Sequence, residues 1–494
     1  MHHLQGSGQT LSADEQQRAQ EAGERGKVGQ LLTPAADRRG LRLDIPRARP
    51  DAAPLDRLAL AELLTHSLHQ AAALTGFRDR AILAVSGGPD SLALVLAAIA
   101  LQGTAALPQT RFHIVTVDHG LRDASAAEAR YVAGVAARFG LGHETLRWAA
   151  PARTGNIAAA AREARYALLA NAARRFGATV ILTAHHADDQ CETHLLARER
   201  GAGVVGLAGM RPVRSLAPDL VLARPFLDIA GDRLKASVAA HGLPAVTDPT
   251  NDDPGSRRVQ LRRQIAAGGL DRDALRARIA GHRSERDALE AGLGEAVAAM
   301  QAAGELCLTE AGTLEIDRDA LRGLGDDTAF VLLQRAIAAV GGRGHGPEGP
   351  ATIRLLEALR GESDGARTLA GVRAVPGETI ALMREYGRAG IAVLTATAGE
   401  RVFDGRFVVD AGAGPSHCGG RLVAFGDLGR GNPVEKTLPV LVAGDSLVAI
   451  PAQLGGKVAA GTPLLAIRSL VGWSLTRDLP PPTGGRAGPS AKPR

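Results

Sequence analysis

The chain has 494 residues, so about three domains of ~150 residues each are expected. Hydrophobic residues make up 45%, which is enough for sizeable cores. A net charge of +6 and a pI near 9.6 are compatible with a nucleic-acid partner but do not require one. Aromatic residues make up only 3%, which argues against a surface that stacks many bases on aromatic rings.

The three cysteines, Cys191, Cys307 and Cys418, lie far apart, and there is no CxxC. This excludes a disulfide scaffold, a cysteine-rich zinc site and a thioredoxin-type pair, and it favours a reduced compartment. The first residues contain no apolar run typical of a signal peptide. No stretch offers ~18 uninterrupted apolar residues with membrane anchors. We therefore expect a cytoplasmic protein with no membrane segment.

The polar composition of residues 1–54, rich in Arg, Asp, Gly and Pro, predicts a largely disordered extension. Residues 55–270 alternate between apolar, β-branched strands and helices. Strands are expected at 81–85, 112–117, 144–148, 179–184 and 220–227, and helices at 90–101, 124–139, 156–177 and 188–200. This alternation predicts an α/β fold with a Rossmann-like parallel sheet covered on both faces. Ligands of such sheets bind beyond the carboxyl ends of the strands.

The second half of the chain changes in character. Residues 271–340 are rich in Ala, Leu, Arg and Glu, and are expected to be helical. After the glycine-rich break at 341–350, short strand-like runs alternate with turns, which predicts one or two small α+β or β-rich modules over 345–478. The Pro- and Gly-rich tail at 479–494 is expected to be disordered.

The first expected strand ends in "SGGPDS" (Ser86–Ser91). Its glycines allow close approach of an anion, Pro89 suits the first helical turn, and the helix start offers unpaired N–H groups to a phosphate. An ordinary strand–turn–helix joint with a capping serine explains the glycines equally well. The stretch is neither a Walker A loop nor a dinucleotide fingerprint. Asp90 would repel phosphates unless a cation intervenes, so we expect Mg²⁺ there.

Two more strand ends carry polar groups. Asp118 directly follows the second strand, where it is placed to reach an adenosine, although a turn or helix-capping aspartate fits as well. The third end, "TAHHADDQCETH", packs two histidines and three acids into eight residues (His185, His186, Asp188, Asp189 and Glu192). Helical spacing predicts that His185, Asp189 and Glu192 share a face. Acids in a first turn favour the helix dipole, but this does not explain the histidines. His and Asp together suit Mg²⁺ binding or proton transfer.

Several motifs occur in a fixed order: "SGGPDS", "VDHGLR", "GNIAAAAREARY", "TAHHADDQCETHLLARERGAGVVGLAGM", "ARPFLDI" and "VTDPTNDD". Together they resemble the bacterial tRNA(Ile)-lysidine synthetases of the PP-loop ATP pyrophosphatase superfamily. The resemblance is strong over residues 80–265 and weaker at 366–385 and 402–409. The first motif alone indicates only the superfamily, and the run from His185 to Met210 narrows it to this family.

The resemblance implies a carbon–nitrogen ligase with a PP-loop catalytic domain over 55–270, a helical region over 271–340 and tRNA-binding modules over 345–478. ATP, with Mg²⁺, adenylates the C2 oxygen of the wobble cytidine in a tRNA(Ile) with a CAU anticodon, and pyrophosphate leaves. L-Lysine then attacks C2 through its side-chain amine and displaces AMP, which gives lysidine.

The resemblance also implies roles for individual residues. The expected catalytic residues are Asp90, Arg162, His185, His186, Asp188 and Asp189. The expected ATP-binding residues are Ser86, Gly87, Gly88, Pro89, Asp90, Ser91 and Asp118. The expected lysine-binding residues are Asp118, Arg122, Asp189 and Glu192, and the expected Mg²⁺ ligand is Asp90. His119, Asn156, Arg165 and Tyr166 match family motifs as well.

Some positions depart from the family pattern, and other functions stay open. The family usually has a glutamate where this chain has Ala158, and we expect Glu163 to compensate. A cytidine thiolase of the same superfamily would need paired cysteines, which this chain lacks. An amidation like that of GMP synthetase would need a glutaminase to supply ammonia, and no glutaminase signature appears in the sequence. A non-catalytic nucleotide- or RNA-binding module is the alternative outside enzymes, since fold alone does not fix function. The sequence does not determine the oligomeric state, a homodimer being one option.

Overall fold

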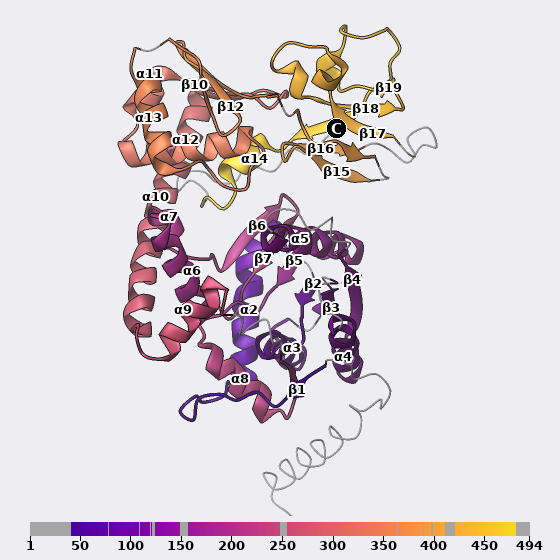
Figure 1. Cartoon of the computed structure of the whole chain (residues 1–494), viewed down its shortest axis with the longest axis vertical. Helices are drawn as coiled ribbons and strands as arrows, with labels where there is room; N and C mark the ends of the chain where they lie inside the picture. Colours follow the sequence, from indigo (N-terminus) through magenta and orange to yellow (C-terminus); the bar gives the residue numbers. More distant parts are fainter. Residues whose placement is uncertain are drawn as a thin grey trace, which may run out of the picture. The chain divides into compact units, whose positions relative to one another are not determined.

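The computed structural model describes residues 41–77, 79–107, 109–118, 120, 124–148, 157–247, 254–362, 364–388, 390–396, 399–410 and 420–480. They form two compact units (Figure 1). The first unit contains the described residues up to Gly201 together with Val205–His282. The second unit contains Ala202–Val204 and the described residues from Arg283 onward.

The first unit is built on a six-stranded sheet in the order β4-β3-β2-β5-β7-β6. The strands are β2 (Arg80–Ala84), β3 (Arg111–Asp118), β4 (Gly142–Arg147), β5 (Val180–Leu182), β6 (Val213–Ala217) and β7 (Leu220–Ala223). All neighbours are parallel except β6, which is antiparallel to β7. The predicted parallel sheet is confirmed. The strand expected at 220–227 ends at Ala223, and the edge strand β6 was not expected.

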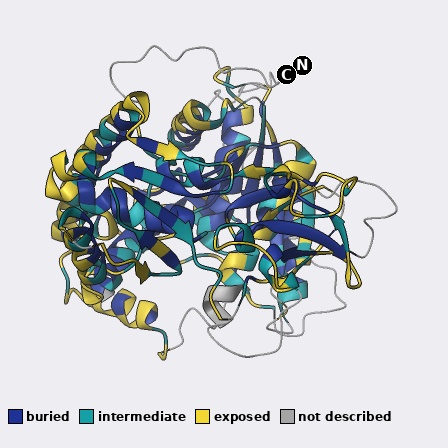
Figure 2. Ribbon diagram, turned by 90° about the horizontal axis from the view of Figure 1, so that it is seen from above, coloured by how far each residue is buried: buried dark blue, intermediate teal, exposed yellow. Residues whose placement is uncertain are grey.

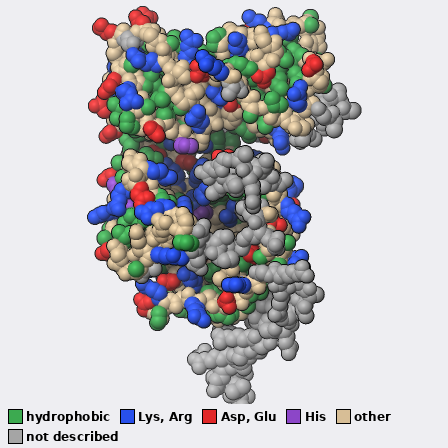
Figure 3. All heavy atoms as spheres, viewed as in Figure 1, with side chains coloured by type: hydrophobic (Ala, Val, Ile, Leu, Met, Phe, Trp, Pro, Cys, Tyr) green, Lys and Arg blue, Asp and Glu red, His purple; other side chains and the backbone are tan. Residues whose placement is uncertain are grey.

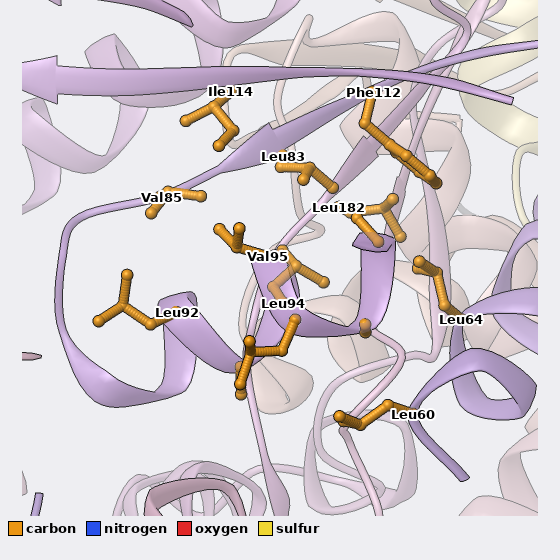
Figure 4. Packing of buried hydrophobic residues seen from close by; sticks show 14 of the residues in the cluster. Leu60, Leu64, Leu83, Val85, Leu92, Leu94, Val95, Phe112, Ile114 and Leu182 are labelled. Atoms are coloured by element: carbon orange, nitrogen blue, oxygen red, sulfur yellow. The ribbon is translucent and has the colours of Figure 1, made fainter. Parts of the chain in front are cut away.

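Helices cover both faces of this sheet. They are α2 (Arg57–Thr75), α3 (Pro89–Gln102), α4 (Ser125–Arg138), α5 (Ile157–Phe176) and α8 (Gly231–Ala240). Successive strand residues point to opposite faces. Leu83 and Leu182 therefore pack with α2 and α3, as Figure 4 shows, whereas Ile82 and Ile181 pack with α5. Burial on both faces explains why β2 reads as a nearly continuous apolar run.

The remaining helices of the first unit pack around α6 (Ala187–Glu199), which begins shortly after the carboxyl end of β5. Helix α6 packs against α9 (Arg257–Ala266) and the start of α10 (Arg272–Ala303) around a small apolar cluster. The short helix α7 spans Val204–Leu207. Cys191 is buried in that cluster, so its role here is packing. Within the described part of the chain, no helix combines the length and apolar character that crossing a bilayer requires.

The segment before α2 differs from the expected disordered extension. Leu43–Asp44 form strand β1, which pairs antiparallel with β8 (Ala245–Val246). The extension therefore contains ordered backbone from residue 41 onward, because it finds a strand edge to pair with. Residues 1–40 and the tail at 481–494 lie outside the described residues.

The second unit begins with a five-stranded antiparallel sheet in the order β11-β12-β13-β10-β9. Its strands are β9 (Leu306–Leu308), β10 (Leu314–Asp317), β11 (Arg367–Leu369), β12 (Val372–Val375) and β13 (Thr379–Arg384). Its helices are α11 (Arg318–Gly323), α12 (Asp326–Val340), α13 (Gly349–Arg360) and α14 (Val471–Thr476). The stretch expected to be helical over 271–340 thus contains the β9–β10 hairpin. One core runs from Leu293 to Leu475, so the expected break near 345 falls inside it.

The last part of the second unit is strand-rich, as predicted. One sheet contains β14 (Leu394–Thr395), β17 (Arg421–Ala424), β18 (Pro439–Ala443) and β19 (Ser446–Ala449). Another contains β15 (Glu400–Phe403), β16 (Phe407–Asp410) and β20 (Ala466–Ser469). Their apolar residues share one core. Figure 2 colours the described residues by burial and shows buried residues, in dark blue, along strands of the molecule. Short 3₁₀ turns at Phe425–Leu428, Glu435–Thr437 and Ala452–Leu454 complete it.

Candidate active site

The loop between β2 and α3 is held by its own serines. Ser91 Oγ donates to the Gly88 carbonyl at 2.9 Å and accepts from the Ser86 amide at 3.2 Å. Ser91 is buried, whereas Ser86 is exposed. Gly88 occupies the N-cap and Pro89 the first turn of α3, as the sequence predicts. Ser91 therefore shapes the loop, and Ser86 is the serine presented to a ligand.

Gly87 has a second reason to be glycine besides access for an anion. Its φ is +87°, a left-handed conformation that side chains rarely adopt. A Cβ at this position would also lie 2.8 Å from Cγ2 of Val246 and 3.3 Å from Cγ2 of Val132. The Val246 amide donates to the Gly87 carbonyl at 2.9 Å. Strand β8 thus packs directly against the loop.

The paired histidines precede helix α6. His186 is the N-cap residue, and Asp189 Oδ2 accepts from its backbone N–H at 3.0 Å, one half of a capping box. The helix starts at Ala187. The expected helical face shared by His185 and Asp189 is therefore wrong, because His185 lies outside the helix. Asp189 and Glu192, three residues apart, do both lie in α6.

His186 lies among three carboxylates. Its Nε2 is 3.6 Å from Oδ2 of both Asp90 and Asp189, and its Nδ1 is 3.7 Å from Oδ2 of Asp188. Burial opposes a charge on the ring, but Asp90, Asp189 and Asp188 outweigh it and raise the pKa of His186 to about 9. The Asp188 amide lies 3.3 Å from Nδ1, a long contact that only a neutral ring can accept. We favour the imidazolium, whose two N–H groups face the acids.

His185 has the opposite electrostatic environment. Its Nδ1 is 2.9 Å from Oγ1 of Thr183. Burial, together with the positive charges of Arg224, Arg165 and Arg162, lowers its pKa well below 6.5. His185 is therefore neutral near pH 7. Of the two expected bases, only His185 is in a state that can accept a proton.

Glu192 is fully buried and faces helix α9. Its Oε1 accepts from Nε of Arg262 at 2.8 Å, and its Oε2 lies 3.8 Å from Nη1 of Arg258. Burial raises the pKa of Glu192, and the two arginines oppose that rise. Glu192, one of the residues expected to bind lysine, thus already has two cationic partners. Neither arginine was singled out from the sequence, where both occur in "SRRVQLRR".

Asp188 and Asp118 also have structural contacts. Asp188 Oδ2 accepts from the Gly231 amide at the start of α8 at 3.1 Å, and its Oδ1 lies 3.8 Å from Nε of Arg272. Asp118, at the end of β3, accepts from the Gly120 amide through Oδ1 at 2.8 Å. Its Oδ2 lies 3.7 Å from Nε of Arg147. Asp118 therefore acts as a turn aspartate, the alternative role considered from the sequence.

The chain is similar to several known proteins. Residues 62–268 match the PP-loop domain family. The tRNA(Ile)-lysidine synthase of Methylobacterium nodulans is 42% identical over 310 residues, covering 62% of this chain and 86% of that protein. The enzyme of Ruegeria pomeroyi is 35% identical and covers 75% of this chain and 87% of its own length. The chain belongs to the tRNA(Ile)-lysidine synthase family. A solved U34-tRNA thiolase, NcsA from Methanococcus maripaludis with its [4Fe-4S] cluster, is 12% identical with a TM-score of 0.36, covering 46% of this chain and 79% of its own, too distant to bear on function.

Some expected family positions fall outside the described residues, namely His119, Arg122 and Asn156, and so does the side chain of Ala158. Glu163 and Arg162 are exposed on α5, and the Arg162 guanidinium lies over the Tyr166 ring, 5.4 Å from its centroid. Arg224 is a residue that the sequence reasoning missed, although it lies in the quoted "ARPFLDI". It is 3% exposed, donates to the Arg211 carbonyl at 2.7 Å, and its Nε has no hydrogen-bond partner among the described residues.

The donors around Asp90 fit Mg²⁺ in part. Asp90 Oδ1 is buried and has no hydrogen-bond partner in the described part of the chain, and carboxylate oxygens are preferred Mg²⁺ ligands. The described residues contain no group of three or more His, Cys, Asp or Glu side chains arranged to hold a metal.

Proposed function

We propose that the chain catalyses ATP-dependent ligation of L-lysine to C2 of the wobble cytidine in a tRNA(Ile) with a CAU anticodon. The products are lysidine in the tRNA, AMP and pyrophosphate. The observation that carries this proposal is the junction of Asp90 and Asp189 around His186 at the carboxyl edge of a PP-loop sheet. The relatives' name, tRNA(Ile)-lysidine synthase, supports it.

ATP would lie over the loop from Ser86 to Ser91. Gly88, where a Cβ would meet only Ser86 Oγ at 3.7 Å, leaves the backbone open to phosphate oxygens, whereas Gly87 is buried against β8. The start of α3 directs N–H groups and the positive end of its dipole toward the phosphates. Asp90 would hold Mg²⁺, which neutralises phosphate charge when bound. The imidazolium of His186 offsets part of the negative charge of Asp90, Asp188 and Asp189, which reduces their repulsion of the nucleotide.

Two balanced steps complete the reaction. In the first, the cytosine C2 oxygen attacks the α-phosphorus, a P–O bond forms, and the bond to pyrophosphate breaks. In the second, the side-chain nitrogen of lysine attacks C2, the C2–O bond breaks, and AMP leaves with that oxygen. The attacking amine loses a proton, and neutral His185 is the acceptor that we propose, a weak base because burial and the nearby arginines lower its pKa. Arg162 and Arg224 add positive charge beside His185, where charge on the transferred phosphoryl group or the lysine carboxylate would be stabilised.

Asp189 is the carboxylate that we propose binds an ammonium group of L-lysine. Glu192 has two arginine partners, and Asp188 is bonded to the start of α8. The contacts of Asp189 with the amide and the ring of His186 are both at Oδ2. Asp118 stays a second candidate beside the nucleotide or the amino acid. Arg122 stays a proposed partner of the lysine carboxylate.

The second unit would bind tRNA through phosphate contacts. Its exposed arginines include Arg354 on α13 and Arg367 and Arg373 on the β11–β12 pair. Basic side chains are visible over the face of the second unit in Figure 3. Phosphate contacts fix the register of a nucleic acid without reading bases. We also propose that the reaction takes place in the cytoplasm, which is consistent with a tRNA substrate.

One incubation tests the proposal. The full chain is mixed with ATP, labelled L-lysine and total tRNA, and the tRNAs are then separated. We expect label in a single isoleucine isoacceptor together with equimolar AMP. The Asp90→Asn variant is the matched control and should give neither. AMP formation without incorporation of lysine would point to another PP-loop enzyme, and absence of both products in the wild-type protein would support a non-catalytic binding module.

A further inference from the structure

Residues 41–56, which we call the strap, run along the first unit before α2 begins. The Thr247 amide donates to the Arg42 carbonyl at 3.0 Å, beside the pairing of Leu43 with Val246 and of Asp44 with Ala245. Leu43 also packs against the main core of this unit. The strap is therefore attached at its start by strand pairing and by apolar contact (Figure 1).

The strap is attached again along helix α8. Arg49 Nε lies 3.4 Å from Oδ2 of Asp232, and Arg233 Nε donates to the Ala53 carbonyl at 3.1 Å. The Leu55 amide donates to Ser237 Oγ at 2.8 Å, and the Leu55 side chain is buried. These contacts use backbone groups and a buried side chain, so the path of the strap is defined over its length.

The strand that the strap pairs with is also the strand that supports the phosphate loop. Val246 donates its amide to the Gly87 carbonyl, and its side chain faces the position where a Cβ of Gly87 would lie. On the other side, the Tyr131 hydroxyl donates to the carbonyl of Pro244, the residue before β8. Strand β8 is only two residues long, and strands this short are held by their neighbours rather than by their own pairing.

We propose that the strap is a positioning element for the ATP site. Strand β1 holds β8 in place, and β8 holds the backbone of Gly87 in the conformation in which the loop binds an anion. The proposal rests on the proposed function in one respect, because it takes the ligand of the loop to be ATP. In this proposal the strap acts through β8 and not through a contact of its own with the substrate. Its loss should leave the loop able to reach the productive conformation but no longer held there, which weakens ATP binding more than the chemical step.

The test compares two substitutions in the full chain. Leu43→Asp removes the apolar attachment of β1, whereas Ile45→Asp places the same charge on a side chain that is already 48% exposed. Amide hydrogen exchange is measured at Thr247, which reports strap attachment, and over residues 86–91. KM for ATP and kcat are measured beside KM for lysine. We expect Leu43→Asp to speed exchange at both places and to raise KM for ATP roughly tenfold, with kcat nearly unchanged. Ile45→Asp should change none of these.

Faster exchange at Thr247 with unchanged exchange over residues 86–91 would overturn the proposal, as would a fall in kcat with KM for ATP unchanged. If Leu43→Asp does not fold, the milder Leu43→Ala replaces it. That variant removes the apolar contact of the strap without adding a charge, so exchange should still be faster both at Thr247 and over residues 86–91. The exchange measurement needs no turnover. A wild-type protein that does not consume ATP would therefore refute the proposed function while leaving the role of the strap testable.

Discussion

Oδ2 of Asp90 lies 3.6 Å from Nε2 of His186, so the first turn of α3 meets the residue that caps α6. The two residues follow β2 and β5, which are neighbours in the parallel sheet. The pair brings the loop of residues 86–91 together with the histidines and acids of residues 185–192, so the two segments form one candidate site. Several measurements follow from this junction.

His186→Asn should remove the positive charge of the ring while a polar side chain stays at the N-cap of α6. Asparagine still accepts a hydrogen bond as an N-cap, but it leaves three carboxylates without the cation among them. We expect the free energy of unfolding to fall by about 3 kcal/mol and AMP formation to be lost. Chemical denaturation and product assays measure these effects. The exposed His69→Asn on α2 is the control, and equal stability of the two variants would show that His186 is not a structural cation.

Asp90→Asn and Ser91→Ala should each abolish AMP formation while tRNA binding stays nearly intact. The first removes a carboxylate charge, and the second removes the hydroxyl that bridges Ser86 and Gly88. Losses of roughly 10²-fold or more in kcat are expected. Ser91→Thr keeps the hydroxyl and should restore part of the activity. Normal turnover in both primary variants would mean that this loop does not hold pyrophosphate.

Gly87→Ala should damage both stability and ATP binding, because a Cβ would meet Val246 and the backbone has φ +87°. The left-handed conformation alone costs about 1–2 kcal/mol for a residue with a Cβ. The matched control is Gly134→Ala in α4, where a Cβ meets no heavy atom within 4 Å. There, alanine should stabilise the helix by up to about 1 kcal/mol. Thermal unfolding and nucleotide titration of both variants check this contrast.

Asp189→Asn should mainly damage transfer of lysine while adenylation survives in part. The amide oxygen can still accept from the His186 backbone, so the start of α6 is kept while the negative charge for an ammonium is lost. Single-turnover detection of adenylated tRNA with and without lysine separates the two steps. Glu192→Gln serves as a comparison that disturbs α9 instead. If Asp189→Asn slows both steps to the same extent, the residue serves ATP or the metal.

Charge reversal in the second unit should weaken tRNA binding without affecting ATP. Deleting residues from 345 onward is a poor test, because it would divide the core that contains Leu333 and Leu382. We instead expect Arg354→Glu with Arg373→Glu to lower tRNA affinity, and the slope of log affinity against log salt to become shallower by about one per lost phosphate contact. Filter binding at several salt concentrations measures this. Unchanged affinity and slope would exclude these two side chains from the tRNA surface.

Much of the first unit could be predicted from the sequence because its signals are local. The apolar runs of β2 and β3, the "SGGPDS" turn and the order of the family motifs each lie within short stretches. The rule that ligands bind at the carboxyl ends of parallel strands then places Asp90 and Asp189 at one edge. The second unit carries weaker local signals: the β9–β10 hairpin follows a long helix and pairs with β13, which lies far along the chain.

Tertiary structure alone decided the states and partners of the side chains. His185 and His186 are adjacent in sequence, yet burial and nearby arginines lower the pKa of the first, whereas carboxylates outweigh burial and raise the pKa of the second. Glu192 meets Arg262 because α9 packs on α6, and β1 is ordered because β8 offers it an edge. Burial and charge at a residue depend on neighbours brought together by folding. A local pattern can therefore name the site residues but cannot assign their protonation or pairing.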